Sequence, residues 1–233
     1  MTSYRENFGF TLAEVLITLG IIGVVAALTI PNMMTDYEKK RVAATIKKDY
    51  SELYEAIKLA EIRNGDFEYW DFSIVNDYSI SEKFIDKYLL PYLKLQKCSA
   101  NSNIIKQKCG YIVSDVGAHY LLPSGSLVSF RIMQTSPEIY TIIDINGPKK
   151  PNVMGTDTFY FVIKDGKILP AGWHDGTTRE KILNSWYGGC NPYTVDKNNG
   201  ISLLRHGCTA LLMIDNWEFK DDYPFKQKAE ISE

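Results

Sequence analysis

One carboxylate stands alone near the start of the longest apolar segment in the chain. Glu14 lies within residues 9–34, GFTLAEVLITLGIIGVVAALTIPNMM, in which every other side chain is uncharged. An ionised carboxylate inside a bilayer costs about 2.5 kcal/mol or more unless an opposite charge pairs with it. A free α-amino group on Phe10 would supply that charge, on the same helix or on a neighbouring copy. The alternative is that Glu14 lies near the membrane surface and extends into water.

The peptide bond between Gly9 and Phe10 is where such an amino group could be generated. A secretory signal peptide carries its small-residue cleavage site after the apolar core, whereas the small-residue junction here precedes that core. Cleavage after Gly9 would remove residues 1–9, retain the apolar segment and leave Phe10 as the new amino terminus. We therefore expect an anchor that stays attached after processing.

Oxygen-bearing side chains gather in a second segment, DINGPKKPNVMGTD, at residues 144–157. Carboxylate and amide oxygens are the ligands that calcium prefers, although the segment lacks the spacing and final glutamate of an EF-hand loop. The other explanation is that these side chains accept hydrogen bonds from the amides of tight turns. Both explanations stay open. The candidate calcium ligands are Asp144, Asn146, Asn152 and Asp157.

The histidines do not form a catalytic pattern. Only His119, His174 and His206 occur, and the chain has no Gly-x-Ser-x-Gly motif, phosphate-binding glycine loop or His-x-x-x-His pair. A grouping of Cys208, His206 and Asp215 has no spacing that distinguishes it from chance. We therefore expect that the protein is not an enzyme.

Four cysteines follow the apolar segment, and none belongs to a Cys-x-x-Cys pair, which argues against zinc and thioredoxin-like sites. An even number beyond a membrane segment favours disulfides in an oxidising compartment. Their order suggests that Cys98 pairs with Cys109 and Cys190 with Cys208, one of three possible connectivities. Buried free thiols are the alternative.

A single long helix is the element that must carry Glu14. Residues 10–31 are long enough, as a helix, to cross a hydrocarbon core of about 30 Å. After Pro31 the chain is polar, but apolar side chains still recur at every third or fourth position. We therefore expect one helix over residues 10–64, bent at Pro31, with its first half in the membrane. The apolar stripe of the second half consists of Val42, Ile46, Tyr50, Leu53, Ile57 and Ala60.

The residues around Glu14 resemble the amino-terminal signature of type IV pilin-like proteins, which include pilins and the pseudopilins of type II secretion. The resemblance rests on Gly9-Phe10, Thr11, Leu12 and Glu14, followed by VLITLGIIGVVAALTIP. It implies cleavage after Gly9 by prepilin peptidase, N-methylation of Phe10 and filament assembly through Glu14. Pro31 stands where many members carry a helix-bending proline. The leader departs from the family pattern because its one arginine is offset by a glutamate.

The remaining chain predicts an α+β fold, in which the long helix packs on an antiparallel β-meander. Residues 79–82, SISE, can form a capping box for a short helix, and strand patterns dominate from residue 111 onward. Asp165-Gly166 is a two-residue hairpin signal. The expected organisation is a leader at 1–9, the long helix at 10–64 with a transmembrane segment at 10–31, a connecting region at 65–110, and a β-rich head with a C-terminal disulfide loop at 111–233.

The expected function is that of a structural subunit of a type IV pilus or type II secretion pseudopilus. The resemblance implies prepilin peptidase, other subunits of a homo- or hetero-polymer and an inner-membrane assembly platform as partners. It places the chain in the bacterial inner membrane, crossing once, with a periplasmic or extracellular head. The net charge of −2 argues against nucleic acid as a partner.

The alternative is a monomeric membrane-anchored binding module of the cell envelope, in which Glu14 has no role in assembly. Major and minor subunits, and pilus, secretion and DNA-uptake systems, share the features described above.

Overall fold

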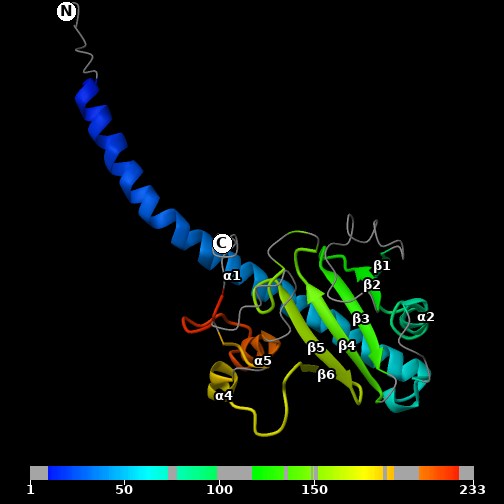
Figure 1. Cartoon of the computed structure of the whole chain (residues 1–233). Helices are drawn as coiled ribbons and strands as arrows, with labels where there is room; N and C mark the ends of the chain where they lie inside the picture. The colour runs from blue at the N-terminus through cyan, green and yellow to red at the C-terminus, as the bar shows by residue number, and fades with distance from the viewer. Residues whose placement is uncertain are drawn as a thin grey trace, which may run out of the picture. The chain divides into compact units, whose positions relative to one another are not determined.

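A computed structural model describes residues 10–72, 78–98, 117–133, 136–147, 149, 152–185, 188–191 and 205–225. The chain divides into two compact units, residues 1–38 and residues 39–233 (Figure 1). The predicted leader with Gly9 and the predicted disulfide partner Cys109 lie outside the described residues.

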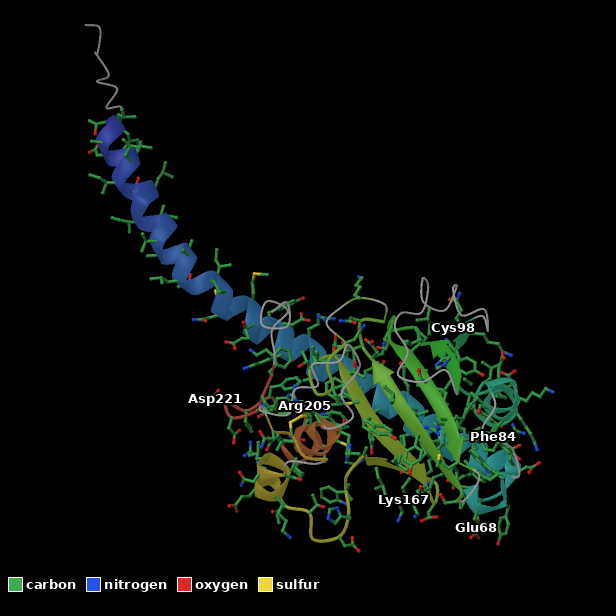
Figure 2. All side chains as sticks on the ribbon, in the orientation of Figure 1. Glu68, Phe84, Cys98, Lys167, Arg205 and Asp221 are labelled. Carbon is green, nitrogen blue, oxygen red and sulfur yellow. A yellow bond between two sulfur atoms is a disulfide. The ribbon has the colours of Figure 1, made fainter. Side chains whose placement is uncertain are left out.

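Helix α1 spans Leu12–Asn64 and contains Pro31, which has no N–H to donate to the carbonyl of Ala27. In the first unit its apolar side chains extend into open space (Figure 2), and an 18-residue window with mean hydropathy 2.3 has none of its residues buried. Within the described ranges, α1 alone is long and apolar enough to cross a membrane. A water-soluble core helix would bury this surface, so the first half of α1 requires lipid or other protein around it.

The second unit is built on a six-stranded antiparallel sheet in the sequential order β1 to β6, which confirms the predicted meander. The hairpin between the last two strands turns at Asp165 and Gly166, whose φ angles of 50° and 66° are those of a two-residue hairpin turn. The strands are β1 Gln96–Lys97, β2 Ala118–Leu121, β3 Leu127–Met133, β4 Glu138–Asp144, β5 Thr158–Lys164 and β6 Lys167–Pro170.

The second half of α1 packs across one face of this sheet and forms the core. Ile46 and Ile57 of α1 have no exposed surface and belong to the same apolar cluster as Phe130 and Phe161 of the sheet. The Tyr50 ring lies 5.8 Å from the ring of Phe161. The amphipathic stripe predicted for this half of α1 is therefore the surface that the head covers, and the α+β arrangement predicted from the sequence is confirmed.

Smaller helices complete the second unit, and three of them (η1, α4 and α5) are not predicted by the sequence pattern. Figure 1 shows α2 beside β1 and β2, α5 near β5 and β6, and α4 beside α5. Six of the eight residues of α5 are buried, so its sequence, GCTALLMI, lacks the polar face by which an amphipathic helix is identified. The bounds are η1 Phe67–Tyr69, α2 Tyr78–Tyr88, α4 Arg179–Asn184 and α5 Gly207–Ile214.

Candidate functional site

Glu14 takes part in a reciprocal set of hydrogen bonds at the first turn of α1. The Thr11 amide donates to Glu14 Oε2 at 2.8 Å, and Thr11 Oγ1 donates to the same oxygen at 2.7 Å. In return, the Glu14 amide donates to Thr11 Oγ1 at 3.3 Å. This is a capping box, in which a threonine before the helix and a glutamate three positions later satisfy each other's amides. The lone carboxylate therefore stabilises the start of the helix that carries it.

The capping box leaves half of the carboxylate for a further partner. Both bonds from Thr11 reach Oε2, and Oε1 accepts no hydrogen bond from the described part of the chain. Phe10, which immediately precedes the cap, is 90% exposed. A partner amine for Glu14 was predicted from the sequence, but the role of Thr11 was not. The Thr-x-x-Glu spacing ahead of an apolar run is the signal that identifies it.

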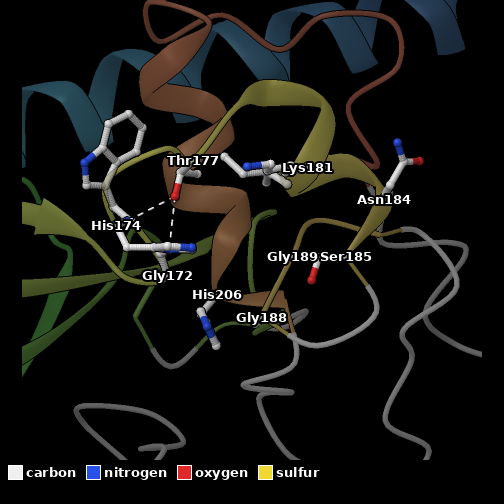
Figure 3. A pocket seen from close by; sticks show the side chains of 11 residues that line it. Gly172, His174, Thr177, Lys181, Asn184, Ser185, Gly188, Gly189 and His206 are labelled. Atoms are coloured by element: carbon white, nitrogen blue, oxygen red, sulfur yellow. Dashed lines mark hydrogen bonds between the residues drawn. The ribbon is translucent and has the colours of Figure 1, made fainter.

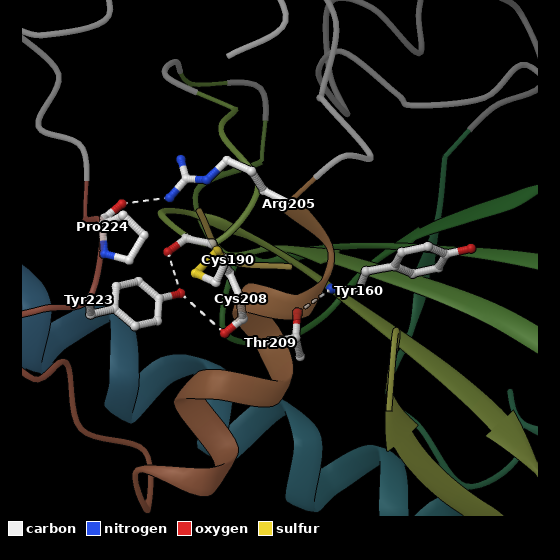
Figure 4. Close-up of a disulfide and its surroundings, with 8 residues drawn as sticks. Tyr160, Cys190, Arg205, Cys208, Thr209, Tyr223 and Pro224 are labelled. Atoms are coloured by element: carbon white, nitrogen blue, oxygen red, sulfur yellow. Dashed lines mark hydrogen bonds between the residues drawn. A yellow bond between two sulfur atoms is a disulfide. The ribbon is translucent and has the colours of Figure 1, made fainter. Parts of the chain in front are cut away.

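The carboxyl-terminal part of the head is closed by a disulfide between Cys190 and Cys208 (Figure 4). The hydroxyl of Tyr223 donates to the carbonyl of Gly155 at 2.8 Å and to that of Cys208 at 3.3 Å. A Cβ atom at Gly155 would lie 2.4 Å from the Cβ of Cys208, so the loop requires glycine at this contact. The disulfide thus joins α5 to the segment after α4 and supports the loop before β5. Cys98 is buried, and its predicted partner lies outside the described residues.

Three of the four predicted calcium ligands come together where Asn146 and Asn152 contact Asp157, which is 3% exposed. Its Oδ2 accepts from the Asn146 side-chain amide at 2.8 Å and from the backbone amide of Asn152 at 2.8 Å. Its Oδ1 accepts from the amide of Val153 at 2.6 Å and from the hydroxyl of Thr158 at 3.4 Å. Four donors thus surround this carboxylate, which is the turn-capping arrangement; a cation would have to displace some of them.

Among the predicted calcium ligands, Asp144 has a pKa that is raised well above its usual value. Its Oδ1 accepts from the Asn146 amide at 3.1 Å. With its amide nitrogen turned toward them, Asn152 donates to Asp144 Oδ2 at 3.1 Å and to the Lys149 carbonyl at 2.9 Å. Burial and the nearby charge of Asp157 raise the pKa of Asp144 to about 8, and burial also raises the pKa of Asp157. The pair therefore favours a positive partner, which is a proton or a cation.

Calcium at this loop stays a prediction. With the Asn152 amide reversed, its side-chain oxygen would join Asp144 Oδ2 and the Lys149 carbonyl in facing a cation. Across the residues that the structure describes, no group of three or more histidine, cysteine or acidic side chains is placed to hold a metal.

A pocket of about 610 Å³ lies between α4, the loop before it and the start of α5 (Figure 3). It brings His174 and His206 to one site, which their sequence separation does not predict. The Lys181 ammonium donates to the Gly176 carbonyl at 3.0 Å. Cys208 beside this pocket is oxidised, and Asp215 binds Arg179 at 2.7 Å. The grouping of Cys208, His206 and Asp215 therefore offers no free thiol nucleophile.

Two family models match the chain. The model described as a family of unknown function (DUF6613) matches residues 32–227, and the prokaryotic N-terminal methylation motif matches residues 5–30. No curated protein and no solved structure matches it. The methylation motif covers the capping box of Thr11 and Glu14 and the exposed apolar half of α1, whereas the other family covers the rest of α1 and most of the head.

Proposed function

Since the chain belongs to the family of unknown function DUF6613 and carries the N-terminal methylation motif of type IV pilin-like proteins, we propose that it is a structural subunit of a type IV pilus or a type II secretion pseudopilus. The observation that carries this proposal is the exposed apolar half of α1 with one capped carboxylate at its start. A helix of this kind can move from lipid into a bundle of identical helices without exposing apolar surface to water.

Processing would create a positively charged amino group that can pair with the Glu14 carboxylate. Prepilin peptidase would cleave after Gly9 and methylate the amino group of Phe10, which then directly precedes the capping threonine. Oε2 stays bound to Thr11, while Oε1 is directed to the amine of a neighbouring subunit. Because the pair is buried among apolar helices, one missing charge would leave the other uncompensated. The requirement for both charges sets the register between neighbours.

The head then lies on the periplasmic or extracellular side, and an inner-membrane assembly platform would add subunits one at a time. In this role the protein works as a building block and needs no catalytic group.

Mass spectrometry of the purified full chain tests the proposal at its first step. We expect the mature protein to begin at an N-methylated Phe10. A chain that keeps residues 1–9 in a host with active prepilin peptidase would contradict the proposal. A Gly9→Leu variant, expected to keep its leader and still insert, is the control for cleavage.

Two substitutions separate the charge of Glu14 from its capping role. Glu14→Gln keeps an oxygen for Thr11 but carries no charge, and we expect it to insert normally and to fail in assembly. Thr11→Ser keeps the capping hydroxyl and should assemble. Assembly of Glu14→Gln at the wild-type level would show that the charge is not required.

A monomeric binding module is the second candidate, and the pocket beside α4 is the observation that favours it. Its volume of about 610 Å³ lies within the range of about 300–1,000 Å³ typical of small-molecule sites. In that case Glu14→Gln would leave the activity of the protein unchanged, whereas enlarging Gly188 at the pocket wall would abolish it.

A further inference from the structure

The pocket beside α4 rests on backbone segments that close tightly around one imidazole ring (Figure 3). A Cβ atom at Gly188 would lie 2.7 Å from His206 Nε2, and one at Gly172 would lie 3.0 Å from His206 Cδ2. A Cβ atom at Gly207 would lie 2.4 Å from the carbonyl oxygen of Gly188. Glycine at these positions therefore lets the segments approach each other. We call His206 and these three glycines the pocket floor.

The pocket floor is also fixed by a covalent bond and by a ring contact. Cys190 and Cys208, which form the disulfide, each directly follow a glycine at this contact. The ring of Tyr160 from β5 meets the His206 ring edge to face, with ring centres 6.2 Å apart. The floor is therefore formed before a ligand arrives, which lowers the entropy cost of binding.

The residues that line the pocket carry one permanent charge, which is the ammonium of Lys181. This ammonium donates to the Gly176 carbonyl at 3.0 Å, which leaves two of its three N–H groups without an acceptor in the described part of the chain. The backbone N–H groups of Gly188 and Gly189 also donate to no acceptor among the described residues. The pocket wall therefore offers a cation and hydrogen-bond donors to a ligand.

Acidic residues near the pocket do not occupy this cation. Asp175 and Glu180 neighbour the lining residues in the sequence, but both are exposed and neither lines the pocket. Their charges act from the solvent side, where water and salt screen them, whereas Lys181 can contact a ligand directly. Arg179 on α4 is already bound by two aspartates. The charge that a ligand meets inside the pocket is therefore positive.

The other lining side chains suit a flat apolar body. Trp173 and Ile182 line the pocket together with the rings of His174 and His206. His174 is held in place by Thr177, whose hydroxyl oxygen accepts from the His174 amide at 3.1 Å and lies 3.0 Å from its Nδ1. Aromatic side chains bind planar molecules through stacked or edge-to-face contacts. The lining thus combines apolar contact area with a single anion-binding group.

We propose that this pocket binds a small organic acid with an aromatic body. The carboxylate contacts the Lys181 ammonium, and the aromatic part lies against Trp173 and Ile182. Because the lining supplies one permanent cation, a monoanion fits it better than a doubly charged phosphate ester. The inference gives the binding-module candidate a ligand class. It does not depend on the filament role, since every lining residue belongs to the head.

Equilibrium dialysis of the detergent-solubilised full chain tests the ligand class. The probe is indole-3-acetate, and indole-3-acetamide is the matched neutral molecule. We expect the acid to bind at least about tenfold more tightly than the amide, because a hydrogen bond to a charged group stabilises a complex more than a neutral one does. Equal affinities for the two probes, or no binding of the acid at millimolar concentration, would overturn the proposal.

Substitutions of Lys181 assign the charge to one residue. Lys181→Gln should lower the affinity for the acid about tenfold and leave that for the amide unchanged, whereas Lys181→Arg keeps the cation and should retain the affinity for the acid. Lys83→Gln is the matched control, at an exposed position of α2 beside the opposite edge of the sheet. Equal affinities of the Lys181→Gln and Lys83→Gln variants for the acid would contradict the proposed contact.

Gly188→Ala tests the pocket floor, because its Cβ atom would displace the His206 ring. It should weaken binding of both probes. Wild-type affinity in a folded Gly188→Ala variant would contradict the assigned site; if this variant does not fold, the Lys181 series decides the question. An unprocessed amino terminus with intact binding of the acid would refute the proposed function alone, whereas a methylated Phe10 without that binding would refute this inference alone.

Discussion

Replacing Asp144 by asparagine should make the head more stable at neutral and alkaline pH and should flatten its pH dependence. The folded state raises the pKa of Asp144 from 3.8 to about 8, through burial and the charge of Asp157. Between these two values the folded chain holds a proton that the unfolded chain has released. The free energy of unfolding therefore falls as pH rises: the contribution is fully present below pH 3.8 and is lost above pH 8.

The size of this effect follows from the shift. At 1.36 kcal/mol for each pKa unit, a rise of about four units corresponds to a loss on the order of 5 kcal/mol between acid and alkaline conditions. An asparagine at position 144 keeps an oxygen for the Asn146 amide, now 3.1 Å away, and carries no charge at any pH. Its nitrogen replaces Oδ2 and donates to the side-chain oxygen of Asn152 once that amide is reversed. It also removes the repulsion from Asp157, so the variant should exceed the wild type most clearly above pH 8.

The assay is denaturant unfolding of the detergent-solubilised full chain from pH 5 to pH 9 at constant ionic strength, followed by tryptophan fluorescence. Asp157→Asn is the matched control. It should destabilise the head at every pH, because an amide nitrogen would then face donors that now bind a carboxylate oxygen. An Asp144→Asn variant that keeps the wild-type pH slope, or a wild-type stability that increases over this range, would contradict this prediction.

Three further outcomes follow from the same structure. Millimolar calcium should raise the melting temperature of the wild type at pH 8.5, where Asp144 is ionised. It should not change the melting temperature of the Asp144→Asn variant. An unchanged melting temperature of the wild type would contradict the predicted calcium site. Ser126→Ala should lower the free energy of unfolding by about 1–3 kcal/mol, because the fully buried Asp49 accepts a hydrogen bond from Ser126. Denaturant unfolding measures this change. An unchanged free energy of unfolding would show that the hydrogen bond does not stabilise the head. Arg205→Met should be neutral or stabilising, since Nε and Nη1 of this buried guanidinium have no hydrogen-bond partner among the described residues. Arg179→Met should destabilise, since Arg179 pairs with the buried carboxylate of Asp215; equal thermal shifts for the two arginine variants would contradict this distinction.

Features that depend on neighbours in the chain could be predicted from the sequence. The length and apolarity of residues 10–31 indicate a membrane helix without any reference to the fold of the remaining chain. Thr11 and Glu14 are three positions apart at a helix start, so their hydrogen bonds need no tertiary contact. The alternation of apolar side chains in the strands and the Asp165-Gly166 turn indicate an antiparallel meander for the same reason.

Helix α5 and the pocket beside it could not be predicted from residues close together in the chain. A helix that is buried almost all round has no polar face, so its sequence reads as an apolar run that could equally be a strand. His174 and His206 share a pocket because α4 and α5 pack together. The separation of the two residues in the sequence does not predict that packing.

By itself, the sequence determined the anchor, the capped carboxylate and the class of fold, because local hydrogen bonding and the periodicity of burial depend on residues a few positions apart. The tertiary structure decided the rest. It buried Asp144 beside Asp157, left two nitrogens of Arg205 without a hydrogen-bond partner among the described residues, and set Arg131, Tyr140, Val162 and Leu169 in one row across four strands. These properties depend on desolvation and on strand register, which are fixed only when distant segments pack against each other.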